Sequence, residues 1–232
     1  MLKRNLSLLL LGSLFTLPGI AHEFTFGAGA LSTNMFTQLS LVDTADFGTT
    51  NNDIQWSATG TGITGEFYAG YAYNINKGFD VGAEVFYILQ GPEVEQFVIE
   101  PRYIKFSMQN ALGFRIVPGF NITPSTRVLA EVGYLFMQTE ISVIDLIPTL
   151  ASDFSTTSTI LKKGMIVYGV GMETMVYQNF GFRASYVVAP EMGNNDSNSN
   201  TASITSTDGT LTYSGSPVFN FFYVGGILKF SF

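Results

Sequence analysis

Apolar and polar residues alternate with a period of two along much of the chain, which is the spacing of β-strands with two unlike faces. Short polar turns at 74–78, 121–125 and 178–179 each join two such segments into a predicted hairpin. A first strand from about Glu23 and a last strand ending at Phe232 bring the number of predicted strands to eight. The six strands between them are predicted at about 63–73, 79–87, 106–120, 127–138, 165–177 and 181–188.

Four long segments separate the hairpins, at 34–60, 90–103, 141–163 and 190–217. They are longer than the loops of compact soluble domains. Because backbone polar groups in lipid must all be paired, tight turns on one side and long loops on the other indicate a sheet that closes on itself. We predict an all-β, closed antiparallel transmembrane β-barrel of eight strands with short periplasmic turns and four long extracellular loops. Ten strands stay possible if part of the first or last loop forms an extra hairpin.

Every charged residue of the predicted strands falls on the face opposite the aromatic side chains. In the segment 79–87, for example, Asp80 and Glu84 oppose Val81 and Val85. The charged residues of this inner face are Glu66, Asp80, Glu84, Lys105, Arg115, Arg127, Glu131, Glu173, Arg183 and Lys229. These five acids and five bases sum to zero, which a narrow interior favours because an unpaired buried charge is costly. We interpret them as an ionic plug that fills the barrel; a lining for an ion or solute path is the alternative.

The aromatic residues of the other face gather toward the strand ends, as in the interfacial girdles of membrane barrels. On the short-turn side they are Phe24, Phe26, Tyr71, Tyr73, Phe79, Phe120, Phe182, Phe230 and Phe232. On the loop side they are Tyr87, Phe106, Phe136, Tyr168, Tyr186 and Phe222.

Composition narrows the class of protein further. Of the 232 residues 46% are hydrophobic, 14% aromatic and only 12% charged, which argues against disorder. The net charge of −7 and the lack of a basic stripe argue against a nucleic-acid partner. The long loops hold 12 of the 18 acidic residues, against Arg102, Lys162 and Lys163 as bases, so the extracellular end is predicted to be acidic.

The N-terminus has the pattern of a secretory signal peptide. Lys3 and Arg4 precede an apolar stretch from Leu6 to Leu17, and small residues end at Ala21. We expect cleavage after Ala21, which leaves residues 22–232 as one barrel domain. A retained membrane anchor is the alternative, but the stretch is short for a spanning helix. The chain has no cysteine, so this exported protein does not rely on disulfides.

The C-terminal segment 222–232 ends in Phe232 and alternates apolar residues before it, among them Phe230. In this it resembles the closing strand of small bacterial outer-membrane β-barrel proteins of the OmpA, OmpX and Opa class and, less specifically, of the OmpW class. The resemblance implies a place in the bacterial outer membrane after Sec export. It also implies that Phe230 and Phe232 form a signal for the barrel-assembly machinery, and that outer-membrane lipid and lipopolysaccharide surround the protein.

No pattern points to catalysis, a cofactor or a transition metal. The single histidine, His22, is predicted at the periplasmic end as a bystander, far from the external rim where a general base would be needed. Asp196 and Asp208 could contact Ca²⁺, although such loops are commonly only solvated. We therefore expect a structural or surface-interaction protein, of the adhesion or envelope-integrity type, whose acidic loops contact a host or cell-surface ligand. The alternative is a narrow porin or OmpW-like channel for small or apolar solutes, suggested by the apolar segment 141–148; an enzyme is disfavoured.

Overall fold

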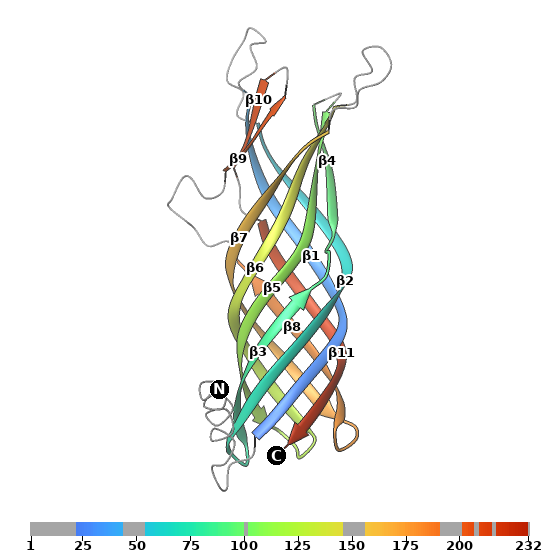
Figure 1. The fold of residues 1–232 in the computed structure, drawn as a ribbon, viewed down its shortest axis with the longest axis vertical. Helices are drawn as coiled ribbons and strands as arrows, with labels where there is room; N and C mark the ends of the chain where they lie inside the picture. Colours follow the sequence, from blue (N-terminus) through green and yellow to red (C-terminus); the bar gives the residue numbers. More distant parts are fainter. Residues whose placement is uncertain are drawn as a thin grey trace, which may run out of the picture.

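The computed structural model describes residues 22–43, 54–99, 102–145, 156–190, 201–206, 209–214 and 217–231. The predicted signal peptide, Phe232 and the two loop aspartates Asp196 and Asp208 lie outside these residues. The described chain forms one tall β-barrel with strongly tilted strands (Figure 1). None of the described residues belongs to a helix that is long and apolar enough to cross a membrane.

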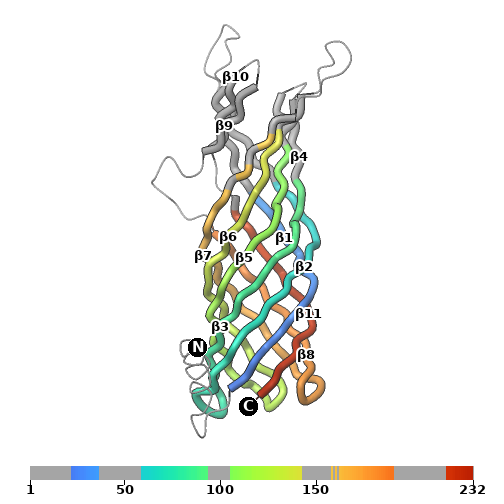
Figure 2. The backbone as a smooth tube through the Cα atoms, in the orientation of Figure 1, coloured from blue at the N-terminus to red at the C-terminus, as the bar shows by residue number. Residues whose placement is uncertain are grey.

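Eight antiparallel strands pair around a closed ring, which confirms the predicted fold. Around the barrel they are β1 (His22–Asp43), β2 (Ile54–Asn76), β3 (Phe79–Ile88), β5 (Arg102–Asn121), β6 (Thr126–Asp145), β7 (Thr156–Met175), β8 (Phe180–Ala189) and β11 (Pro217–Ser231). The ring closes where β11 pairs with β1, from Glu23 opposite Ser231 to Thr37 opposite Pro217. Figure 2 shows the start of β1 and the end of β11 side by side at one end of the barrel.

The three predicted tight turns lie at this same end. At the turn between β2 and β3, the Gly78 amide donates to Oδ1 of Asn76 at 2.8 Å. Between β5 and β6, the Thr126 amide donates to Oγ1 of Thr123 at 3.0 Å. Local side-chain acceptors of this kind explain why Asn and Thr mark the turns in the sequence.

The strands extend further into the predicted loops than the apolar pattern suggests. β1 and β2 stay paired up to Leu41 opposite Ile54, and β6 and β7 up to Ile144 opposite Thr156. On β2 and β7 the backbone pairing continues through Ser- and Thr-rich segments, because strands outside lipid need no apolar face. Three shorter strands also form in the loop ranges, namely β4 (Glu93–Ile99), β9 (Thr201–Ser206) and β10 (Gly209–Ser214).

The extra hairpin β9–β10 decides between eight and ten strands. Apart from its partner β9, β10 pairs among the described strands with the far end of β1, from Ser40 opposite Ser214 to Asp43 opposite Leu211. The hairpin therefore lies at the end of the barrel away from the tight turns (Figure 1), beyond the ring of eight.

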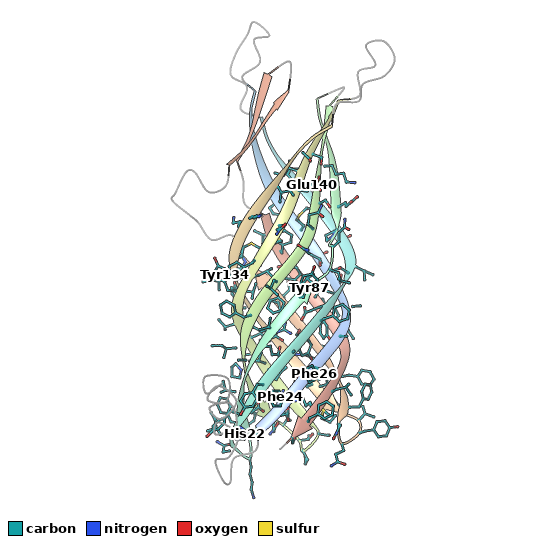
Figure 3. The ribbon with its side chains drawn as sticks, in the orientation of Figure 1. His22, Phe24, Phe26, Tyr87, Tyr134 and Glu140 are labelled. Atoms are coloured by element: carbon teal, nitrogen blue, oxygen red, sulfur yellow. The ribbon has the colours of Figure 1, made fainter. Side chains whose placement is uncertain are left out.

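The outward face of the ring is apolar over a band of limited height. On β6 the band runs from Val128 to Phe136, and both side chains are exposed on the barrel wall. The first outward charge above it on this strand is Glu140, which Figure 3 shows well above Tyr87 and Tyr134, while Phe24 and Phe26 lie near the opposite end. An apolar band of about 25 Å is typical of outer-membrane barrels. A substantial part of each long strand therefore projects beyond it.

Candidate functional site

The interior of the barrel near the tight turns is filled by charged side chains from all eight strands of the ring. At its centre, Arg115 of β5 donates from Nε to Oε2 of Glu84 at 2.7 Å and from Nη2 to Oε1 of Glu66 at 2.9 Å. Its Nη1 lies 3.1 Å from Oε2 of Glu131. All four side chains are buried. One guanidinium thus holds carboxylates from β2, β3 and β6 together.

Arg183 of β8 connects this group to the next. Its Nη1 donates to both Glu84 oxygens, at 2.7 and 2.9 Å. Its Nη2 lies 3.4 Å from Oε1 of Glu131, and its Nε lies 3.7 Å from Oε1 of Glu173. Two arginines therefore share Glu84 and Glu131, so the removal of one cation leaves each carboxylate with another.

Glu173 of β7 anchors the part of the network nearest the turns. Its Oε2 accepts from Nε of Arg127 at 2.6 Å and lies 2.7 Å from Nζ of Lys229. Arg127 also donates to Oδ1 of Asp80 at 2.7 Å, and Lys229 lies 2.7 Å from Oε1 of Glu23. Charges from opposite walls of the barrel are joined in this way into one continuous ionic network.

Nine of the ten residues that the sequence assigned to the interior lie in this network; they are Glu66, Asp80, Glu84, Arg115, Arg127, Glu131, Glu173, Arg183 and Lys229. The prediction was wrong for Lys105, whose Nζ lies 2.6 Å from Oε2 of Glu93 at the far end of the barrel. The physical reason is a β-bulge. From Met108 to Ala111 β5 advances three residues while β6 advances two, which reverses the facing of everything beyond it.

One member of the network, Glu23, was not predicted. It was predicted only as the approximate start of the first strand, although its position two residues before the inward-facing Thr25 places it on the inner face. The exchange of Lys105 for Glu23 changes the balance of charge. Among the described residues the network holds six carboxylates and four cationic side chains, rather than five of each.

Aromatic rings cover the arginines on the side away from the turns. The Arg183 guanidinium lies 4.8 Å from the ring centroid of Tyr68, and Arg115 lies 4.8 Å from that of Phe86. Tyr68 meets Tyr223 edge-on with 5.9 Å between centroids. Gly27 makes this possible, because the Tyr68 ring occupies the space that a Cβ atom there would fill. These contacts form a boundary between the ionic network and the next layer.

Beyond the arginines the barrel interior is apolar. Met35, Met108, Met137 and Met165 are all at most 2% exposed and belong to a single cluster of buried side chains. The other large members include Leu31, Ile88, Phe106, Leu135, Ile141, Phe219 and Phe221. Flexible methionines suit such a space because they fill irregular gaps. The interior is therefore closed by two successive layers, one ionic and one hydrophobic.

The apolar layer corrects two further assignments. Phe106 was predicted in the outer girdle and Met108 on the same lipid-facing side, but their exposures of 2% and 0% place them in the core. The bulge that turns Lys105 outward also turns these two residues inward. The other loop-side girdle residues with described exposure, Tyr87, Phe136, Tyr168, Tyr186 and Phe222, are exposed on the wall.

His22 has more contacts than a bystander. The Tyr71 hydroxyl is hydrogen-bonded to its Nδ1, and the two ring centroids lie 5.6 Å apart. The Tyr73 ring is 5.8 Å away on the same side. His22 thus belongs to the aromatic girdle beside the tight turns, far from the extracellular end.

The sequence and fold of this barrel are similar to those of known outer-membrane proteins. Residues 7–207 match the family model described as outer membrane protein beta-barrel domain. The chain belongs to this family. As a member of the outer membrane protein beta-barrel family it lies in the bacterial outer membrane. No curated protein sequence is significantly similar to it.

Several solved outer-membrane barrels are similar to this family member. Ail, the attachment invasion locus protein of Yersinia pestis, is 15% identical with a TM-score of 0.38, over 87% of this chain and 99% of Ail. Neisserial surface protein A is 14% identical with a TM-score of 0.38, over 88% of this chain and 99% of that protein. The outer membrane protease OmpT from Escherichia coli is 11% identical with a TM-score of 0.45, over 94% and 99%.

Proposed function

We propose that this outer-membrane barrel is a non-conducting anchor whose projecting extracellular end binds a ligand on a host cell or on another cell surface. The observation that carries the proposal is the closed interior. The ionic network and the methionine-rich layer lie in series along the barrel axis, and their side chains are buried. An eight-stranded barrel has an interior that side chains can fill, so a water-filled path has no room here.

The projecting strands provide the binding surface. β1, β2, β5, β6 and β7 extend past the apolar band, and the hairpin β9–β10 is added to β1 at that end (Figure 1). With Lys105 added to them, the predicted loop segments hold four bases against 12 acidic residues in the sequence. An acidic surface favours a partner with basic patches and makes the encounter depend on salt.

Conductance is the sharpest test of the closed interior. The purified barrel, inserted into planar lipid bilayers, is expected to give no discrete openings, because two buried layers would have to rearrange before an ion could pass. A porin inserted under the same conditions serves as the positive control. Reproducible single-channel steps from the pure protein would contradict the anchor proposal and favour the narrow channel.

Deletion of residues 201–214 tests the binding surface. The hairpin pairs only with the far end of β1, so the ring of eight should still form and the unboiled protein should still migrate differently from the boiled one on a denaturing gel. We expect bacteria that display the deleted barrel to adhere less to host cells than bacteria with the full chain. Equal adhesion by both, at equal surface amounts, would count against this end as the binding site.

We also infer that the barrel is not an enzyme. The support is the position of its one histidine, His22, which is engaged by Tyr71 at the end opposite the projecting strands. A general base that works near neutral pH is most readily a histidine. Export with cleavage after Ala21 likewise stays a prediction, which N-terminal sequencing of the mature protein would test.

A further inference from the structure

A groove of about 360 Å³ opens in the outer wall of the barrel where apolar side chains give way to polar ones. Its apolar side is formed by Tyr87, Leu112 and Phe136, which are register partners across β3, β5 and β6. Phe136 is in turn opposite Gly164 of β7, whose bare backbone is packed by the Tyr134 ring. Figure 3 shows Tyr87 and Tyr134 at mid-height on this wall.

The polar side of the groove faces the extracellular end. Asn110, which the bulge of β5 turns outward, donates to the Tyr87 hydroxyl at 3.0 Å. Gln138 and Lys162 are register partners on β6 and β7 and line the same groove. The groove is therefore amphipathic, with an apolar row toward the membrane and amides and an ammonium group above it.

Lys162 stands out by its charge. It is exposed, and no ion pair joins it to any residue of the described chain. The acids of this belt are engaged elsewhere, since Glu140 accepts from Gln109 at 2.7 Å and Glu93 is paired with Lys105. The groove thus presents Lys162, which has no ion pair among the described residues, and its neighbour Lys163 above an apolar surface.

We propose that this groove binds a phosphate-bearing lipid of the outer leaflet, the chemical class to which lipopolysaccharide belongs. The phosphate contacts Lys162 and the neighbouring amides, and an acyl chain lies along Tyr87, Leu112 and Phe136. The placement supports a lipid because the groove is part of the membrane-embedded wall, and a basic site at the lipid–water boundary suits an anionic headgroup. The site is independent of the proposed ligand at the extracellular end.

Titration of lipid A into the folded, detergent-solubilised barrel, read by native mass spectrometry, tests the site. We expect Lys162→Gln to weaken binding about tenfold, the effect of losing one charge-assisted phosphate contact. The matched control is Lys77→Gln, which removes the same charge from an exposed turn at the other end of the barrel. It should bind as tightly as the unaltered protein. Lipid A stripped of its phosphates should bind the unaltered barrel as weakly as Lys162→Gln binds lipid A.

Three results would overturn the assignment. One is equal affinity of Lys162→Gln and the unaltered barrel, with both showing the heat-dependent gel shift of a folded barrel. Another is equal affinity for phosphorylated and dephosphorylated lipid, which would leave only non-specific apolar contact. The third is occupation of the site by something other than a lipid. This would be seen as saturation by inorganic phosphate alone, or as a dimer of the chain that Lys162→Gln abolishes.

Discussion

Individual buried carboxylates contribute unequally to the ionic network. Glu173 lies within 3.7 Å of three cationic side chains, whereas Glu66 contacts only Arg115 among the described residues. Removal of one partner from a buried charge network leaves the others unpaired in a medium of low dielectric constant. The carboxylate with three partners should therefore matter most to stability.

We predict that Glu173→Gln lowers the free energy of unfolding by about 3–5 kcal/mol, the cost of breaking a buried ion pair. Glu66→Gln should cost clearly less, because Arg115 keeps Glu84 and Glu131 and the amide oxygen can still accept from it. Denaturant unfolding of both variants, refolded in the same detergent, gives the comparison. Equal losses would show that the network responds as a whole and not pair by pair.

At the residue scale the sequence predicted most of this site. Strict alternation was enough to place nine charged residues inside, because each strand keeps its facing as long as its pairing is regular. It did not reveal that Glu23 pairs with Lys229, which lies 206 residues further along the chain. Such a contact depends on how β1 and β11 close the ring.

The strand β5 shows why alternation fails for an element. Its bulge at Gln109 and Asn110 has no distinct signal, because the apolar residues Phe106, Met108, Leu112 and Phe114 keep a spacing of two across it. Because of this one extra residue, Lys105 faces outward and Phe106 faces inward, the reverse of the predicted facing. The upper parts of β2 and β7 were concealed because they are rich in Ser and Thr and have no apolar pattern.

Cysteine labelling tests the register of β5 directly. Because the natural chain has no cysteine, Lys105→Cys and Phe106→Cys each introduce a single thiol. We expect a membrane-impermeant maleimide to label Lys105→Cys rapidly in the folded barrel on intact cells. Phe106→Cys, in the apolar layer, should be labelled only after unfolding. The opposite order would mean that the strand alternates without a bulge.

On the scale of the whole molecule, the two interior layers and the outer band without charges together fit the barrel to a lipid bilayer. The wall is apolar where it meets lipid, and the inside is filled with ion-paired side chains or packed methionines, so stability does not depend on disulfides. The low proportion of charged residues reflects this division. The charges that remain are concentrated in the interior network and at the projecting end, where the proposed binding takes place.

The last residue offers a way to separate assembly in the cell from the stability of the finished barrel. The described pairing of β11 with β1 ends at Ser231 opposite Glu23, and Phe230 is opposite Phe24 with its ring 6.4 Å from that of Phe26. We predict that Phe232→Ala refolds in detergent with unchanged heat stability, because the ring is already closed without it. In cells the amount of folded barrel in the outer membrane should fall several-fold, because the assembly machinery is expected to read the terminal aromatic residue.

Phe182→Ala is the matched control, since Phe182 is a lipid-facing phenylalanine near the same end, and it should leave assembly unchanged. Gels of boiled and unboiled samples measure the amount of folded barrel in outer-membrane fractions and the heat stability of the refolded protein. If Phe232→Ala lowers the stability of the refolded barrel as much as it lowers the amount in cells, the role of Phe232 is structural.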